Sequence, residues 1–377
     1  MKVALVHDLL TQMGGAERVL AVLHQMYPEA PIYTLASNFD KMMHDLKGAD
    51  IRTTWAQKIP GVEANFKKLL PIYPIALQQM DFREYDVVIS SSFAFVKGIK
   101  VPKETFHLCY CHTPMRFAWD FETYISRESY SPLIKNGLRF YVKYLKYWDR
   151  KTAGRVNEYI ANSTVVKERI QHCYNRESSV IFPPVETERY RISEQVEDFY
   201  LIVSRLIPYK RIDLAVEAFN QIGAKLYVVG GGPDLERLRG MAKSNVQFLG
   251  RLEDEEVARL MSQCRAFIFP GEEDFGITPL EVNAAGRPVI AYKGGGALDT
   301  IRPPLNGVYF EQPNAASLAD AVRQCESMTW NPELIRAHAD KFNVDRFKIE
   351  FDKHLQTKYR AFLESTNQRK SVGVSLS

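Results

Sequence analysis

The sequence predicts an α/β protein built from two doubly wound parallel sheets. Short apolar runs rich in β-branched residues alternate with helical patterns, which is typical of parallel sheets covered by helices on both faces. The 377 residues suffice for about two domains. The expected strands are residues 3–6, 32–34, 86–89, 107–111 and 159–161 in the first half, and residues 199–203, 225–229, 246–249, 266–269 and 289–291 in the second.

Two adjacent prolines, Pro183 and Pro184, separate the two series of strands and suit a stiff connector. We therefore expect a first domain over residues 1–182, a connector over 183–198 and a second domain over 199–342. Residues 343–377 form a charged helical tail, which we expect to pack back toward the first domain.

The composition excludes several classes of protein. Hydrophobic residues make up 46% of the chain and charged residues 25%, which is ordinary for a globular protein. A net charge of +4 is too small to indicate a nucleic-acid partner. Five cysteines without metal-ligand spacing favour a reduced, cytoplasmic compartment. Because no apolar run reaches about 18 residues, we expect no membrane-spanning helix.

Two acids lie on either side of a turn that contains glycine. Glu273 follows the expected strand 266–269, and Glu281 lies where a helix is expected to start. Open α/β sheets bind ligands outside the carboxyl ends of their strands, so both acids could face one ligand. A second interpretation stays open, in which Thr278 to Glu281 form a capping box with Pro279 at the first helical position.

Glycines follow several of the expected strands. Gly14 and Gly15 come after the first strand and open a helix, whose free amides suit an anion. No third glycine follows at the spacing of the dinucleotide fingerprint. Glycines 230–232 and 294–296 also follow strands, and ordinary turn formation is the alternative explanation for each group.

Cationic residues and a histidine occupy two more strand ends. Arg205, Lys210 and Arg211 follow the first strand of the second half, where they could neutralise a diphosphate. His112 follows the strand 107–111. It could bind a sugar hydroxyl or move a proton, and a structural histidine is the equal alternative.

Together these motifs resemble glycosyltransferase family 4, whose members have the GT-B fold: two facing Rossmann-like, doubly wound parallel-sheet domains with an interdomain cleft. The family motif is a pair of glutamates with seven residues between them, as at Glu273 and Glu281. The resemblance covers Met1 to about Phe351. Further matches are Gly14-Gly15, Ala161-Asn162-Ser163, Pro183-Pro184-Val185, Arg205 with Lys210, Gly230 to Pro233, Phe275-Gly276, Pro279 and Gly286-Arg287-Pro288-Val289.

The resemblance implies a role for each matching position. Arg205 and Lys210 would hold the donor diphosphate, Glu281 would bond the ribose, and Glu273 would lie beside the donor sugar. Glu273, His112, Arg205 and Lys210 form the catalytic set that the resemblance implies. The implied donor-binding set is Gly14, Gly15, Arg205, Lys210, Gly230, Glu273, Phe275, Gly276, Ile277 and Glu281. One position departs from the family, because Asp274 stands where common members have glycine.

The resemblance also implies an activity. The segments 204–215 and 111–114 are similar to those of bacterial mannosyltransferases that build O-antigens and exopolysaccharides. We therefore expect a retaining transfer of mannose from GDP-mannose to a polyprenyl-diphosphate-linked glycan, as in lipopolysaccharide biosynthesis, with neither metal nor cofactor. The alternatives are a UDP-sugar donor, or a sugar-nucleotide-binding protein of this fold without transferase activity.

A basic, aromatic helix is expected over residues 135–151. Its cations recur at spacings of three and four, which is typical of helices that lie on anionic membranes. Residues 66–73 form a second such patch. We expect a peripheral protein on the inner face of the cytoplasmic membrane, and a packed helix with a solvated face is the equal alternative. The cations are Lys135, Arg139, Lys143, Lys146 and Arg150, with Phe140, Tyr141, Tyr144, Tyr147 and Trp148 between them.

Overall fold

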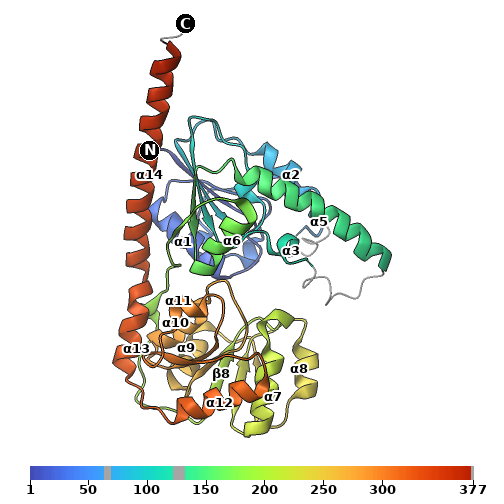
Figure 1. The fold of residues 1–377 in the computed structure, drawn as a ribbon, viewed down its shortest axis with the longest axis vertical. Coiled ribbons are helices and arrows are strands. Elements are labelled where there is room, and N and C mark those ends of the chain that lie inside the picture. Colours follow the sequence, from blue (N-terminus) through green and yellow to red (C-terminus); the bar gives the residue numbers. More distant parts are fainter. Residues whose placement is uncertain (63–68, 122–131, 375–377) are drawn as a thin grey trace. The chain divides into compact units, whose positions relative to one another are not determined.

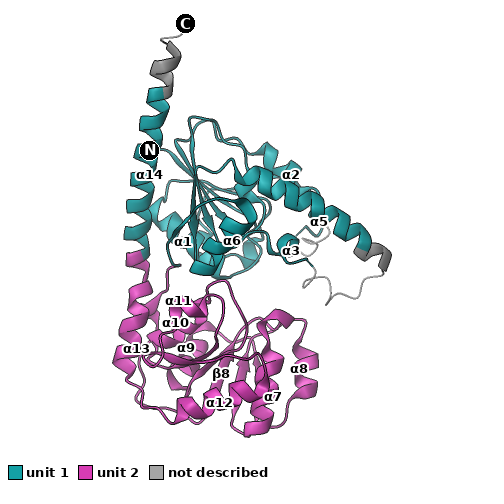
Figure 2. Ribbon diagram, in the orientation of Figure 1, with its two compact units in different colours: residues 1–182, 347–377 teal, residues 183–346 magenta. Residues whose placement is uncertain are grey.

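The computed structural model describes residues 1–62, 69–121 and 132–374, and it divides into two compact units (Figures 1 and 2). Unit 1 contains Met1–Phe182 and Phe347–Ser377, and unit 2 contains Pro183–Arg346. The stretch expected as a connector, residues 183–198, thus belongs to unit 2. The long C-terminal helix α14 (Val344–Val374) belongs to unit 1 from Phe347 onward.

Unit 1 is built on a seven-stranded parallel sheet with the order β3-β2-β1-β4-β5-β6-β7. The five strands predicted from apolar runs are present, which confirms the α/β fold class. Two strands were missed, and both are short, incompletely buried strands at the two edges of the sheet. The strands are β1 (Val3–His7), β2 (Ile32–Thr34), β3 (Ile51–Thr53), β4 (Val87–Ser92), β5 (Phe106–Cys111), β6 (Glu158–Ala161) and β7 (Ser179–Val180).

Unit 2 contains a six-stranded parallel sheet with the order β10-β9-β8-β11-β12-β13. The five expected strands are again present. The missed strand, β13, lies at an edge, and its run of four residues begins with glycine. The strands are β8 (Tyr200–Val203), β9 (Leu226–Val229), β10 (Val246–Gly250), β11 (Phe267–Phe269), β12 (Val289–Tyr292) and β13 (Gly307–Phe310).

Helices connect the strands in both units, as parallel order requires. In unit 1, α14 packs on the sheet through aromatic residues: the ring of Phe347 lies 5.8 Å from that of Tyr110 on β5, and Phe362 lies 5.3 Å from Phe106. The other helices are α1 (Gly15–Met26), α2 (Tyr73–Ala76), α3 (Arg116–Trp119), α5 (Pro132–Ala153) and α6 (Thr164–Tyr174) in unit 1, and α7 (Ile212–Ile222), α8 (Leu235–Met241), α9 (Asp254–Gln263), α10 (Ile277–Ala284), α11 (Ala297–Thr300), α12 (Ala315–Glu326) and α13 (Pro332–Ala339) in unit 2.

A buried carboxylate joins the ends of β1 and β4, which are neighbours in the sheet of unit 1. Asp8 follows β1 directly and is fully buried. Its two oxygens accept hydrogen bonds from four successive backbone amides after β4, at 2.8, 2.8, 2.6 and 3.0 Å, which belong to Phe93, Ala94, Phe95 and Val96. These bonds satisfy both the charge and the amides of a buried turn.

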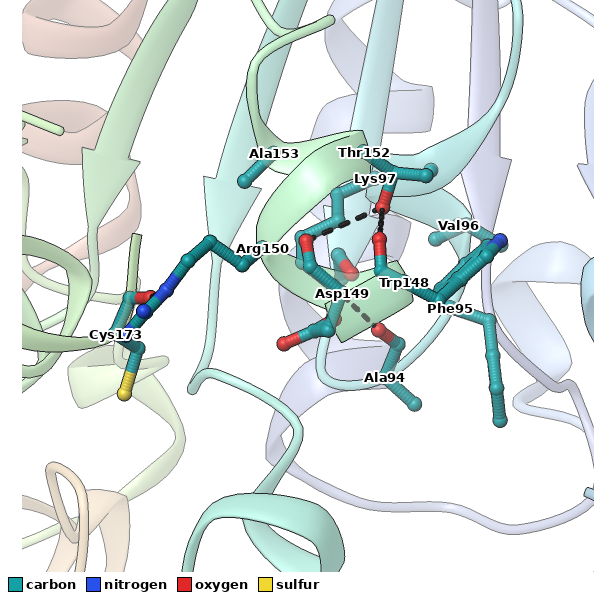
Figure 3. Close-up of polar contacts among 12 residues, drawn as sticks. Ala94, Phe95, Val96, Lys97, Trp148, Asp149, Arg150, Thr152, Ala153 and Cys173 are labelled. Carbon is teal, nitrogen blue, oxygen red and sulfur yellow. Dashed lines mark hydrogen bonds and ion pairs between the residues drawn. The ribbon is translucent and has the colours of Figure 1, made fainter. Parts of the chain in front are cut away.

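A buried ion pair fixes α5 to the same turn (Figure 3). Lys97 lies in the short 3-10 helix Val96–Gly98, and its ammonium contacts the carboxylate of Asp149 on α5. Lys97 is 1% exposed and Asp149 is 0% exposed. The ammonium also donates to the Ala94 carbonyl at 2.9 Å, and the carboxylate accepts from the Trp119 indole at 2.7 Å. A charge pair buried this deeply is stable only when its remaining hydrogen-bonding atoms have partners, as they do here.

The first prediction concerns this ion pair. Replacing Lys97 with Met removes the ammonium and leaves the buried carboxylate of Asp149 uncompensated. We expect the free energy of unfolding to fall by about 3–5 kcal/mol, as measured by urea denaturation. The double variant Lys97→Met/Asp149→Leu should recover most of the loss.

The matched control is Lys2→Met, which breaks an ion pair with Glu84 whose two side chains are 61% and 55% exposed. Exposed ion pairs contribute little, so this variant should unfold at nearly the same urea concentration as the original protein. Equal losses in Lys97→Met and Lys2→Met would contradict the anchoring role of Lys97.

Candidate functional site

Four neighbouring strands of unit 2 end in loops that pack on one another through glycine. β9, β8, β11 and β12 are consecutive in the sheet. Gly230 after β9 has a φ of +126°, and a Cβ there would lie 2.0 Å from the Ser204 carbonyl oxygen after β8. A Cβ on Gly232 would lie 2.2 Å from the Leu206 oxygen. These glycines therefore let two loops of main chain touch, as only residues without a side chain can.

The loop that carries Glu273 is held in the same way. The Glu273 carbonyl accepts a hydrogen bond from the Gly296 amide at 2.8 Å. A Cβ on Gly295 would lie 2.3 Å from that carbonyl oxygen, and one on Gly296 would lie 2.2 Å from the Phe275 Cα. The main chain of Glu273 is thus fixed by its neighbours after β12, which leaves its side chain for other contacts.

That side chain forms an ion pair with Lys210. Lys210 ends the short 3-10 helix Pro208–Lys210 after β8, and Glu273 follows β11. β8 and β11 are adjacent, although this 3-10 helix, three α-helices and two strands separate them in the chain. The sheet therefore reverses its strand order between them, which is where open α/β sheets bind ligands. The side chains are 13% and 20% exposed, so both reach the surface of this edge.

The other cations predicted at this edge follow β8 as well. Arg205 lies in the loop between β8 and the 3-10 helix and is exposed. Arg211 has a φ of +53° and places its guanidinium 3.3 Å from the Asp213 carboxylate. Of the predicted catalytic residues in unit 2, the structure brings Lys210 and Glu273 into direct contact.

The helix after this loop begins earlier than the capping box predicts. α10 begins at Ile277, and Gly276 precedes it with a φ of +83° and no side-chain cap. Thr278 is therefore the second helical residue, so the alternative interpretation of residues 278–281 as a capping box is wrong. Glu281 is the fifth helical residue and lies beyond the first turn, contrary to expectation. The physical reason is Gly276, whose left-handed backbone starts the helix two residues before Pro279.

Three further donor-site predictions lie around this helix start. Phe275 is 3% exposed and packs against Phe342, with ring centroids 6.2 Å apart. Ile277 is half-buried, and Glu281 is 5% exposed. Asp274, where the chain departs from the family, is half-buried. The side chains of Phe275 and Glu281 are thus largely inside unit 2.

The glycine pair of unit 1 lies at the start of a helix, as predicted. α1 begins at Gly15, and Gly14 precedes it in an extended conformation. A Cβ on Gly14 would lie 2.8 Å from Oε2 of Glu17, an acid that is 1% exposed. Because Gly14 has no side chain, there is space beside it for the buried carboxylate of Glu17. The free backbone amides at the start of α1 lie there as well.

His112 directly follows β5 and is 7% exposed. Its Nε2 lies 2.8 Å from Oγ of Ser91 on β4. Burial, together with a smaller contribution from the nearby His7, lowers the pKa of His112 to about 3. The imidazole is consequently neutral at neutral pH, with one nitrogen occupied by Ser91. Within the described residues, its Nδ1 has no hydrogen-bond partner.

Sequence reasoning missed the polar residues around His112. Ser91 contacts His112, His7 contacts Ser91, and Glu17 faces His7. Asp8 and Lys97 fix the adjacent turn. A signal for some of them was present. His7 and Asp8 end the first strand, and Glu17 follows the two glycines by two residues. Ser91 gave no signal, because its contact depends on the neighbouring strands β1 and β5.

The basic helix is present as α5. Its aromatic residues lie on two faces, one packed against the core and one exposed. Tyr141 and Trp148 pack against the core of unit 1. Phe140, Tyr144 and Tyr147 are 79%, 51% and 63% exposed. Arg139, Lys143, Arg150 and Lys151 are exposed too. The side chain of Lys135 is outside the described residues.

The second expected patch, residues 66–73, is not supported as a surface. Residues 66–68 lie outside the described part of the chain, and Tyr73 is fully buried in the core of unit 1. Within residues 1–62, 69–121 and 132–374, no helix is both long and apolar enough to cross a membrane. The same residues hold no group of three or more His, Cys, Asp or Glu that could bind a metal ion.

Two protein-family models match the chain in succession. The model for Glycosyltransferase Family 4 matches residues 13–189, and the model for Glycosyl transferases group 1 matches residues 186–341. The chain belongs to glycosyltransferase family 4. Both matched regions contain residues that the motifs singled out, with Gly14, Gly15 and His112 in the first and Lys210 with Glu273 in the second.

Several curated relatives of the chain are mannosyltransferases. A GDP-mannose-dependent alpha-(1-6)-phosphatidylinositol monomannoside mannosyltransferase of Mycobacterium tuberculosis is 34% identical over 155 residues, which are 36% of this chain and 40% of that protein. An alpha-1,3/1,6-mannosyltransferase of Dictyostelium discoideum is 26% identical over 329 residues, 73% of this chain and 75% of that one. O-antigen chain mannosyltransferase C of Escherichia coli is 28% identical over 193 residues, 46% of this chain and 49% of its own length. The chain spans about two fifths of the length of the mycobacterial relative.

Solved structures share the fold. The Anabaena protein HepE in complex with UDP has a TM-score of 0.73 at 18% identity, over 95% of this chain and 100% of that one. The lipopolysaccharide outer core galactosyltransferase WaaB in its apo form has a TM-score of 0.65 at 17% identity, with the same coverage. These similarities confirm the predicted GT-B fold of the family.

The second prediction concerns His107, a histidine on β5. His107 is fully buried, its Nε2 lies 2.8 Å from Ser90 Oγ, and burial lowers its pKa to about 3. Because the folded pKa lies below the unfolded value of 6.5, the unfolded chain binds more protons between these values. The resulting stability is complete above about pH 6.5 and is lost as the pH falls toward 3. We therefore expect the free energy of unfolding of His107→Gln to depend less steeply on pH than that of the original protein. The difference in slope should be about 1.4 kcal/mol per pH unit in this pH window.

Urea denaturation at several pH values between 4 and 8 measures this slope. The exposed His44 provides the control, since His44→Gln removes a histidine without removing a buried one. An unchanged slope in His107→Gln would show that this histidine is not buried as a neutral ring.

Proposed function

We propose that this protein is a retaining hexosyltransferase that moves mannose from GDP-mannose to a glycan acceptor carried on a polyprenyl diphosphate. The observation that carries the proposal is the contact between Lys210 and Glu273 at the point where the strand order of unit 2 reverses. The names of the relatives support the donor, because they include GDP-mannose-dependent enzymes and an O-antigen mannosyltransferase.

The chemistry of the cations fits a diphosphate leaving group. The Lys210 ammonium has three N–H groups, so it can keep its contact with Glu273 and still donate to a phosphate oxygen. Arg205 is exposed after the same strand and can bind a phosphate in bidentate fashion. Charge placed where the leaving group becomes anionic lowers the barrier without a covalent step. In this proposal Arg205 and Lys210 supply that charge, and neither a metal nor a cofactor is needed.

The remaining family residues complete the proposed site. Glu281 bonds the ribose, Glu273 lies beside the mannose, and Phe275 to Ile277 bind sugar hydroxyls through the main chain. We propose that the same donor also contacts Gly14, Gly15, Gly230 and His112. We propose that the acceptor hydroxyl attacks on the face that the diphosphate leaves. The bond from the anomeric carbon to the phosphate breaks, the bond to the acceptor oxygen forms, and the acceptor proton passes to the leaving phosphate.

A UDP-sugar donor is the second candidate. HepE, which has the same fold, was solved with UDP and with UDP-glucose. The half-buried Asp274 adds an acid next to Glu273 at the place proposed for the donor sugar. In this second candidate, Asp274 determines the choice of donor.

The third prediction tests donor and site together. GDP-mannose should raise the melting temperature of the protein more than UDP-glucose, UDP-N-acetylglucosamine or ADP-glucose do, because only a bound donor stabilises the folded state. The same measurement with a chelator present tests whether binding needs a metal. Selective stabilisation by a UDP-sugar would show that this sugar nucleotide, and not GDP-mannose, is the donor.

Lys210→Ala and Glu273→Ala should each lower mannosyl transfer by at least about a hundredfold, since each removes a group that contacts the reacting donor. Lys293→Ala is the matched control, because Lys293 also follows a strand of this sheet but pairs with the exposed Glu311. Near-normal turnover in Lys210→Ala or Glu273→Ala, with folding intact, would rule out the assigned roles.

We also propose that the outer face of α5 binds an anionic membrane, from which a lipid-linked acceptor would be taken. Three exposed aromatic side chains lie among exposed cations on this face, namely Phe140, Tyr144 and Tyr147. Aromatic rings suit the level of the lipid headgroups, and cations are attracted by anionic lipids. An ordinary solvated helix face has no need of three exposed rings.

The fourth prediction concerns this face. The protein should float with vesicles that contain phosphatidylglycerol at low salt, and less so at high salt, because the attraction is partly electrostatic. The variant Phe140→Ser/Tyr144→Ser/Tyr147→Ser should float at least about tenfold less, because apolar burial in the headgroup region is lost.

The control variant is Phe39→Ser, which removes another exposed ring of unit 1, 60% exposed and distant from α5 in the sequence. It should bind vesicles as the original protein does. Equal binding by the triple variant, or absence of binding at low salt, would contradict the membrane proposal.

A further inference from the structure

A chain of four polar side chains leads from α1 to His112 within unit 1. Nε2 of His112 lies 2.8 Å from Ser91 Oγ, and the same Oγ lies 3.1 Å from Nδ1 of His7 at the end of β1. Nε2 of His7 lies 3.7 Å from Oε1 of Glu17. His7 and Ser91 are fully buried, Glu17 is 1% exposed and His112 is 7% exposed. Protein groups, rather than bulk water, therefore decide where the protons of this chain lie.

The number of protons limits the arrangement to two choices. The Ser91 hydroxyl has one proton and lies between two ring nitrogens. When both rings are neutral, one must donate to Oγ and the other must accept from it. Burial keeps His112 neutral. The two choices differ in which nitrogen of His112 carries its proton.

Glu17 selects between these choices. Nε2 of His7 is buried and has no hydrogen-bond partner among the described residues, and the carboxylate of Glu17 is the acid that faces it. A carboxylate favours an N–H on the nitrogen nearest to it. His7 then presents a bare Nδ1 that accepts the Ser91 proton, and Ser91 Oγ accepts from Nε2 of His112.

We propose that Glu17, acting through His7 and Ser91, is a positioning residue that keeps Nδ1 of His112 unprotonated, so that this atom accepts a hydrogen bond from a sugar hydroxyl. The sugar part rests on the proposed function. The arrangement of protons rests on the distances within unit 1 alone.

The surroundings of Glu17 support this role. Glu17 lies in the first turn of α1, where the helix dipole favours a negative charge. The Gln12 amide donates to its Oε1 at 3.3 Å, and its Oε2 has no hydrogen-bond partner among the described residues. A side chain at Gly14 would collide with Oε2. The glycine therefore helps to hold the carboxylate beside His7.

Nitrogen NMR of the protein with 15N-labelled histidine tests the proton positions directly. Long-range correlations distinguish a protonated ring nitrogen from a bare one, and the His112 signals are assigned by their loss in His112→Gln. We expect the proton on Nε2 and a bare Nδ1 in the original protein. In Glu17→Gln, which keeps the shape but removes the charge, the Nδ1 signal should move toward the protonated position. A protonated Nδ1 in the original protein, or unchanged signals in Glu17→Gln, would overturn the proposal.

Glu29→Gln is the matched control, because it removes one acid from an exposed position of unit 1 and should leave the His112 signals unchanged. In the mannosyl-transfer assay, Glu17→Gln should lower kcat by at least about tenfold, as expected for a misplaced imidazole proton. KM for GDP-mannose should stay within about twofold. A shifted Nδ1 signal with an unchanged kcat would sink the positioning role.

The spectrum needs no donor, so it separates this proposal from the proposed function. If the expected nitrogen signals appear but no mannose is transferred, the proposed donor fails and the proton arrangement stands. If mannose is transferred but the nitrogen signals contradict the proton arrangement, the positioning role of Glu17 is wrong and the proposed transferase function stands.

Discussion

The carboxylate of Asp8 is the contact on which the carboxyl edge of unit 1 depends. It accepts four backbone hydrogen bonds from Phe93 to Val96 and so ties the end of β1 to the turn after β4. Hydrogen bonds to a charged group contribute about 1.5–3 kcal/mol each. His7 directly precedes this carboxylate, and Lys97 directly follows the amides that bind it. One buried acid thus places both the histidine that faces Glu17 and the cation that anchors α5.

Unit 2 holds its strand-end loops by a different device. Its loops are fixed by main chain packed on main chain, which glycines 230, 232, 295 and 296 permit. The carbonyl of Glu273 serves this packing, whereas its carboxylate contacts Lys210. The ion pair between Glu273 and Lys210 is therefore additional to the main-chain packing that holds these loops. That separation is what a site requires if its charged groups are to change partners when a diphosphate arrives.

The sequence was sufficient for what depends on local patterns and insufficient for what depends on strand order. Apolar runs predicted the buried strands, whereas β3 and β7 are incompletely buried edge strands that leave no such run. The family motif predicted both glutamates, but Glu273 meets Lys210 only because β8 and β11 are adjacent in the sheet. The helix start was misplaced because the proline rule favoured Pro279, while the left-handed Gly276 decides it. His7 and Ser91 lie on β1 and β4, and His112 follows β5, so no spacing in the sequence could have joined them.

For α5, too, the sequence predicted less than the structure shows. The periodicity predicted the helix but not which of its side chains face the core. Asp149 is buried and three aromatic residues are exposed, which inverts the usual distribution of polar and apolar residues. Burying an aspartate is tolerable only with a partner, and Lys97 comes from a turn about fifty residues away. That pair and the buried side chains of Val142 and Leu145 hold one face of α5 against the core of unit 1. Phe140, Tyr144 and Tyr147 lie on the exposed face. The exposed rings are thus on the face of α5 that the core of unit 1 does not cover, which is the face for which we propose membrane binding.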